Sequence, residues 1–85
     1  MTGLNNTYSQ RWASEPRPDG IPLSLWETIG LNRANMPLQF PHGAYMTAWL
    51  HKHCGLTTEQ AKGASHYLWP SFQRFMVRIK SGRAA

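Results

Sequence analysis

The single cysteine, Cys54, constrains the fold of this chain more than any other residue, because it excludes an intramolecular disulfide in a protein of only 85 residues. Secreted domains of this size usually need several disulfides to compensate for a small core. This chain must instead bury its own large side chains, and 41% of its residues are hydrophobic, including four Trp. The lack of a disulfide framework predicts a reducing, cytoplasmic location.

The clearest hydrophobic periodicity lies near the C-terminus. Large apolar side chains recur there with the spacing of one helix face, at Phe72, Phe75, Met76 and Ile79. This spacing predicts a helix over residues 71–80. Pro70 has no amide proton to donate and clashes with the preceding turn, so we expect a kink or a new helix start at Ser71.

Two further helices are expected upstream. The first runs from about 41 to 54 and ends at Gly55, which can adopt the left-handed conformation of a helix stop. The second covers 57–69 and opens with a capping box, in which the Thr57 hydroxyl and the Gln60 side chain three residues later satisfy free amides.

A shorter helix is expected from Ser24 to Gly30, because Ser24 and Glu27 also match a capping box. Residues 1–22 are rich in Pro, Gly and Asn, which favour turns and extended backbone. The sequence therefore predicts an all-α fold, a small bundle of three to four short helices over 23–82, with an extended, flexible N-terminal arm over 1–22 and a short tail over 83–85. The expected core comprises Trp26, Ile29, Met46, Trp49, Leu50, Leu56, Ala61, Ala64, Leu68, Phe72, Phe75, Met76 and Ile79.

The net charge of +5 is concentrated at one end of the chain. Up to Glu59 the cations and anions balance, and the excess cations are Lys62, Arg74, Arg78, Lys80 and Arg83. Such one-ended basicity predicts an anionic partner surface, which includes nucleic acid and acidic protein faces. The alternative is a solvated helix face with no partner.

The segment from Thr47 to His66 has the outline of a helix-turn-helix motif with Gly55 in its turn. His51 departs from this outline, because a small residue is expected where the two helices cross. This interpretation predicts nucleic acid as the partner. The alternative is that the two helices simply pack as a helical hairpin and do not read DNA. The predicted contacts are Thr58, Gln60, Lys62, His66, Arg74, Arg78, Lys80 and Arg83.

A protein partner is the competing hypothesis, with the chain acting as an inhibitor, an adaptor or a small subunit. The arm carries Tyr8, Arg11 and Trp12, residue types that are enriched in binding hot spots. The aromatic residues Trp26, Trp49, Trp69, Phe72 and Phe75 are also expected to be partly exposed. In the alternative, Trp12 covers the domain's own core and the other aromatic residues fill it.

Catalysis, cofactors, small-molecule substrates and membrane insertion are not expected. His51, His53, Cys54 and His66 are candidate zinc ligands, but their spacing does not complete a tetrahedral set. Cys54 and His51 lack the orienting third group that a nucleophile and base need. The N-terminus has no basic and apolar signal segment, and no apolar run is long enough to span a bilayer.

Overall fold

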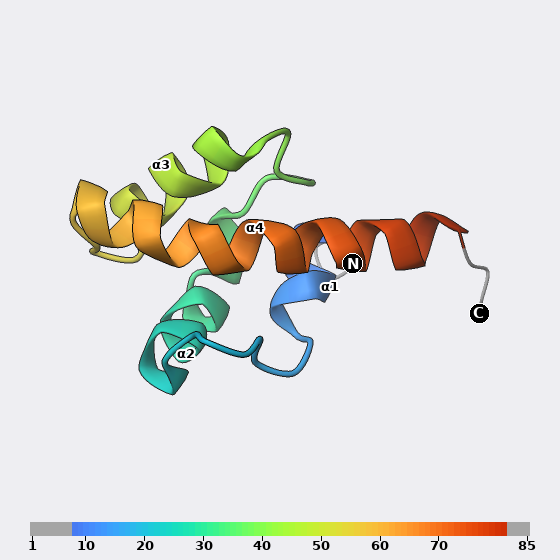
Figure 1. The fold of residues 1–85 in the computed structure, drawn as a ribbon, viewed down its shortest axis with the longest axis horizontal. Coiled ribbons are helices and arrows are strands. Elements are labelled where there is room, and N and C mark those ends of the chain that lie inside the picture. Colours follow the sequence, from blue (N-terminus) through green and yellow to red (C-terminus); the bar gives the residue numbers. More distant parts are fainter. Residues whose placement is uncertain (1–7, 82–85) are drawn as a thin grey trace.

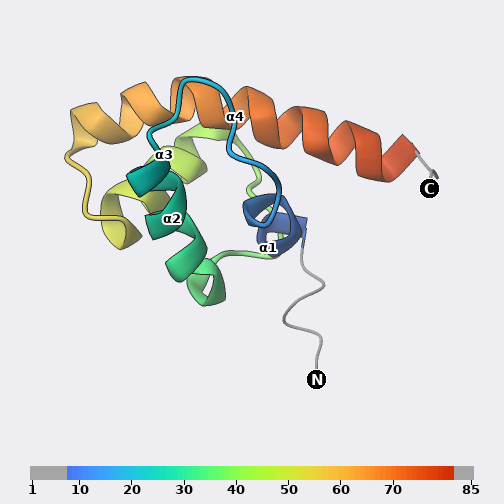
Figure 2. The same ribbon diagram turned by 90° about the horizontal axis from the view of Figure 1, so that it is seen from below.

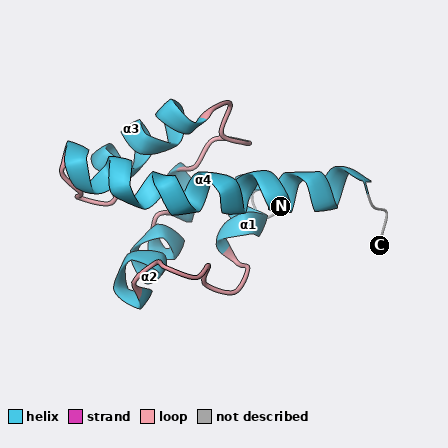
Figure 3. Ribbon diagram, in the orientation of Figure 1, coloured by secondary structure: helices cyan, strands magenta, loops and turns pink. Residues whose placement is uncertain are grey.

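A computed structural model describes residues 8–81, and these residues are mainly helical (Figures 1 and 3). The helices are α1 (Tyr8–Ala13), α2 (Leu23–Leu31), α3 (Gly43–His53) and α4 (Thr58–Ser81), with a short 3-10 helix, η2 (Arg33–Asn35), after α2. None of the described residues is in a strand, so the predicted all-α fold is confirmed. Residues 1–7 and 82–85, the latter including Arg83, lie outside the described part of the chain.

The longest helix, α4, spans the whole molecule (Figure 1). α3 packs along the N-terminal half of α4, and in Figure 1 it lies on one side of α4 with α1 and α2 on the other. Figure 2, turned by 90°, shows that all three lie against the same face of α4. The last turns of α4 extend beyond the other helices. The other described helices therefore cover the C-terminal end of α4 on fewer sides than its middle.

α4 continues through Pro70 as one helix, so the expected new helix start at Ser71 is wrong, whereas a kink at this position stays a prediction. A proline inside a helix removes one backbone hydrogen bond and costs about 3 kcal/mol. The buried face of α4 nevertheless continues across Pro70, with Leu68 before it and Phe72 after it both almost completely buried. Helices in proteins are stabilised mainly by packing of such a face, and here that packing outweighs the cost of the proline.

The capping box at the start of α4 is confirmed. The amide of Gln60 donates to Thr57 Oγ1 (3.0 Å), and the amide of Thr57 donates to Gln60 Oε1 (2.9 Å). The capping box expected at Ser24 is wrong, because α2 begins one residue earlier and none of the described side chains caps it. The carbonyl of Pro22 already accepts from the amide of Trp26 (3.1 Å), which places Ser24 inside the helix.

The expected boundaries of α3 agree with the structure. His42 precedes the helix, and its Nδ1 accepts a hydrogen bond from the amide of Tyr45 (3.1 Å). Cys54 forms the C-cap, and Gly55 follows with φ +72°, the left-handed conformation predicted for a helix stop. The turn from α3 into α4 is therefore encoded locally.

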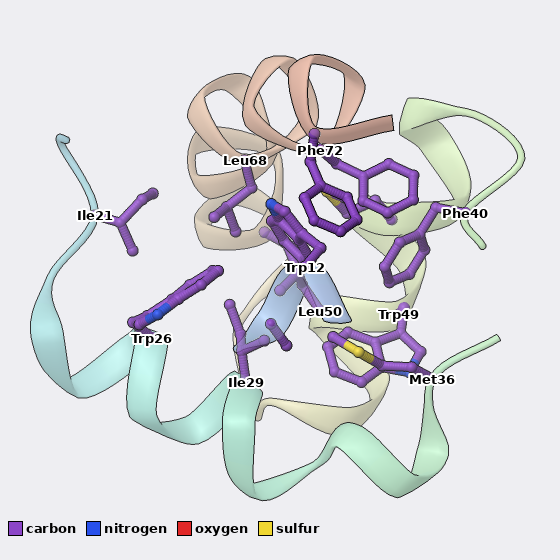
Figure 4. Packing of buried hydrophobic residues seen from close by; sticks show 14 of the residues in the cluster. Trp12, Ile21, Trp26, Ile29, Met36, Phe40, Trp49, Leu50, Leu68 and Phe72 are labelled. Atoms are coloured by element: carbon purple, nitrogen blue, oxygen red, sulfur yellow. The ribbon is translucent and has the colours of Figure 1, made fainter. Parts of the chain in front are cut away.

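Trp12 lies at the centre of the core rather than on an arm (Figure 4). Its ring makes edge contacts with those of Trp26 (5.1 Å between centroids) and Phe72 (5.4 Å), and its Nε1 donates to Ser71 Oγ (3.1 Å). Burial of a tryptophan side chain contributes roughly 4–6 kcal/mol, which favours docking of this segment over an extended arm. The expectation that residues 1–22 stay outside the core therefore fails from Tyr8 onward, while residues 1–7 lie outside the described range.

Most of the predicted core is buried. Leu56, Ala64 and Ile79 are exceptions, since they lie half-buried at its margin. The aromatic residues form the core, as in the alternative interpretation, and only Trp69 of the five considered is half-buried. The buried hydrophobic residues outside the predicted core are Trp12, Ala13, Ile21, Met36 and Phe40, and the polar residues Ser9 and Gln10 are also buried.

Candidate functional site

The predicted nucleic-acid contacts within residues 8–81 all belong to α4 and are exposed, namely Thr58, Gln60, Lys62, His66, Arg74, Arg78 and Lys80. Glu59 is the acidic residue at the start of this helix, and every charged residue after it is a cation. The cations are sparse, however, because Lys62 and Lys80 are about 27 Å apart along the helix axis. The structure thus gives α4 a weakly basic outer face.

Arg78 differs from Arg74, although the sequence places both on one side of the helix. Its Nη2 atom lies 2.8 Å from Glu15 Oε1, and its guanidinium group lies 5.5 Å from the centroid of the Phe75 ring. Arg78 thereby connects the C-terminal half of α4 to the segment that follows α1. One of the predicted contact residues is therefore already engaged within the molecule.

The helix-turn-helix segment forms two helices that lie along one another, as in the hairpin alternative (Figure 1). The hydroxyls of Thr47 and Ser65 are 2.8 Å apart between α3 and α4. His51 is exposed, and its Nδ1 lies 2.7 Å from the carbonyl of Leu56, which can only accept, so Nδ1 carries the proton. Gln60 is engaged in the capping box and is less available for reading bases.

The three predicted arm contacts differ in how far they are buried. Trp12 is 2% exposed and cannot anchor a partner, which corrects its assignment as a contact residue. Tyr8 is half-buried against the core, whereas Arg11 is exposed on α1.

The histidines and Cys54 do not converge on a site. Among residues 8–81 there is no group of three His, Cys, Asp or Glu side chains that could hold a metal ion. Burial raises the pKa of the Cys54 thiol to about 11, so it is protonated at neutral pH and is a poor nucleophile.

Two open grooves on the C-terminal half of α4 were not predicted. A groove of about 550 Å³ includes Phe40, Pro41, Trp69, Met76, Val77 and Lys80 in its lining, and a second groove of about 500 Å³ is lined by Pro70, Gln73, Arg74, Val77 and Arg78. Gln73 and Val77 line both grooves, and Val77 is 67% exposed. We call the lining of both grooves the Val77 surface. Within residues 8–81 it contains three cations and no acidic side chain.

A third groove, of about 580 Å³, lies between α2 and the N-terminal half of α4, and the turn after α3 also lines it. We call it the α2–α4 groove. Ile21, Leu25 and Leu56 contribute apolar surface to it, and Gly63 and Tyr67 line it from α4. Gly63, a glycine in the middle of a helix, is the sequence signal that could have pointed to this groove.

No helix within residues 8–81 combines the length and the apolar character that crossing a membrane requires. In comparisons with protein-family models, curated proteins and solved structures, no match to this chain was found.

Proposed function

We propose that this chain is a non-enzymatic docking domain that binds an acidic segment of a larger protein through the Val77 surface. The observation that carries this proposal is the exposed Val77 side chain, which lines two open grooves near the end of α4 that extends beyond the other described helices. Solvent-exposed apolar side chains beside a groove are typical of protein interaction sites. An inhibitor, an adaptor or a small subunit would each use such a surface.

The charges around the grooves favour an acidic partner. Arg74 and Lys80 lie about 9 Å apart along the helix axis and border an apolar strip that contains Trp69, Met76 and Val77, whereas Arg78 is paired with Glu15. Charge complementarity at the rim raises the rate of encounter and sets the orientation, while the apolar centre supplies most of the affinity. The matching ligand is an amphipathic segment whose apolar side chains enter the grooves and whose Asp or Glu side chains face the cations.

Nucleic acid is the second candidate, and a different observation supports it. The outer face of α4 carries Lys62, Arg74 and Lys80 with no acidic side chain after Glu59. Phosphate contacts alone would leave the apolar lining of the grooves exposed, so this candidate ranks below the protein partner. Binding by phosphate contacts would weaken steeply with salt.

A site-specific crosslinker distinguishes these candidates. We would replace Val77 with a photoreactive phenylalanine analogue in the full chain and irradiate cells of the source organism. Leu31 provides a matched control, because it is a large apolar residue that is 86% exposed on α2, away from the Val77 surface. We expect a discrete adduct from position 77 that is sensitive to protease, resistant to nuclease and absent from position 31.

The requirement for positive charge on the Val77 surface is tested with the same crosslinker at position 77. Replacing Arg74 and Lys80 with Glu should abolish the adduct, whereas replacing Arg11 and Lys52 with Glu, which changes the net charge equally on other helices, should leave it. A nuclease-sensitive adduct would favour the nucleic-acid candidate. Equal adducts at positions 77 and 31 would reject docking through the Val77 surface altogether.

A further inference from the structure

We infer a second binding site in this protein: the α2–α4 groove accepts a compact, uncharged and largely apolar small molecule. Its volume of about 580 Å³ falls in the range of small-molecule sites, which is roughly 300–1,000 Å³. This site lies outside the Val77 surface and shares none of its lining residues. The inference concerns binding and implies no reaction.

The groove is short and bounded, which favours a compact ligand over a long peptide. Its wall on α4 extends from Gln60 to Tyr67, about 10 Å along the helix axis. Cys54 and Leu56 in the turn after α3 also border it. Gly20, which has φ +90°, packs so closely on the Tyr67 ring that an added Cβ would lie 3.1 Å from it. The backbone before α2 therefore comes against α4 at this position.

The lining favours an uncharged ligand. Among the described residues that line the groove there is no Asp, Glu, Lys, Arg or His. The Cys54 thiol is protonated at neutral pH because its pKa is raised to about 11 by burial. An ionic ligand would lose hydration without gaining a countercharge, which disfavours its binding. The hydroxyl groups of Ser24 and Thr28 supply polar groups that can orient a neutral ligand.

Gly63 leaves part of the groove wall on α4 without a side chain. It lies inside α4, where glycine is less favourable than alanine. Its φ is not positive, and an added Cβ would meet no atom within 4 Å, so neither the backbone conformation nor the packing of the described residues requires glycine there. Gly30 on α2 shares these properties outside the groove, so Gly63 adds space at the α4 wall and is not by itself evidence of a ligand.

Two probes test the charge and size of the ligand. We would titrate the ¹⁵N-labelled full chain with 1-naphthol, which is neutral at pH 7, and with 1-naphthalenesulfonate, an anion of similar ring size. We expect 1-naphthol to shift the amide resonances of Ser24, Gly63 and Tyr67 in a saturable manner and to bind about tenfold or more tightly than the sulfonate. Equal binding of both probes, or shifts confined to other residues, would overturn the inference.

A pair of glycine variants tests the location. Gly63→Leu fills the groove, while Gly30→Leu places the same side chain on α2 at a position that also has no atom within 4 Å of an added Cβ and does not line the groove. Leucine favours the helix at both positions, so neither variant should lower the melting temperature. We expect the affinity for 1-naphthol to fall about tenfold or more in Gly63→Leu only. Unchanged affinity in Gly63→Leu would overturn the inference, and Gly63→Ala provides a smaller obstruction if leucine disturbs the fold.

Discussion

Buried tryptophans join segments of this protein that are distant in sequence. The indole Nε1 of Trp12 donates to Ser71, that of Trp26 donates to the carbonyl of Glu15 (3.1 Å) and that of Trp49 donates to the carbonyl of Asn35 (3.1 Å). Each of these side chains buries a large apolar surface without leaving its N–H unsatisfied. A core of few but large residues can therefore hold a small domain together without a disulfide.

Trp12→Ala tests this role at the level of one residue. Removing a buried tryptophan side chain should lower the free energy of unfolding by about 3–5 kcal/mol, because a cavity is left between Trp26 and Phe72. Urea denaturation monitored by circular dichroism provides the measurement. The control Leu31→Ala, at an 86% exposed position, should stay within about 0.5 kcal/mol of wild type. An equally small change in Trp12→Ala would mean that the segment with Trp12 behaves as an arm and does not stabilise the core.

At the level of the secondary-structure element, Pro70 is the main irregularity. It lies inside α4 and therefore leaves the carbonyl of His66 without its helical amide partner. The residue is half-buried and also lines one groove of the Val77 surface. Pro70 therefore lowers the stability of α4 at a position that lines the candidate docking surface.

Replacing Pro70 with Ala should therefore stabilise the protein. The alanine restores the missing amide donor, and we expect the free energy of unfolding to rise by up to about 3 kcal/mol in urea denaturation. Pro16→Ala, in the exposed segment before α2, should instead lower it by about 0.4–1 kcal/mol, because the unfolded chain gains freedom. If Pro70→Ala also proves less stable than wild type, the packing of the proline ring contributes more than the hydrogen bond.

At the level of the whole molecule, the Glu15–Arg78 ion pair joins the segment after α1 to the C-terminal half of α4. The side chains of Arg78 and Glu15 are 62% and 37% exposed, so solvent screens their attraction. The core contacts of Trp12 hold the same two parts of the chain together more strongly. The ion pair therefore orients Arg78 and contributes little to stability.

A double-mutant cycle with Glu15→Gln and Arg78→Gln measures this contribution. We expect a coupling energy of about 0.2–1 kcal/mol that decreases in high salt. The Arg74→Gln, Arg78→Gln double variant should accordingly fold normally, as shown by its melting curve and circular dichroism spectrum. A coupling well above this range would mean that the pair, rather than the core, holds the N-terminal segment in place.

The sequence by itself determined the features of this protein that depend on neighbouring residues. The periodicity around Phe75, the capping box of Thr57 and Gln60, and the stop at Gly55 are local, and the structure confirms each of them. Local spacing also identified the cations of α4, although their role as contacts stays a prediction. Such features follow from the helix repeat and from backbone conformation, which short segments specify.

Only the tertiary structure decided the placement of the segment with Trp12, the continuity of α4 through Pro70 and the position of the grooves. Each depends on residues far apart in the chain, such as Trp12 and Ser71, which are 59 positions apart. The many turn-forming residues before α2 indicated an arm, because residue propensities describe only local backbone preferences. The free energy gained by burying Trp12 is larger than the free energy of those local preferences. The α2–α4 groove and the groove that includes Phe40 and Pro41 likewise arise where separate segments meet, and periodicity along one helix contains no information about what lies beside it.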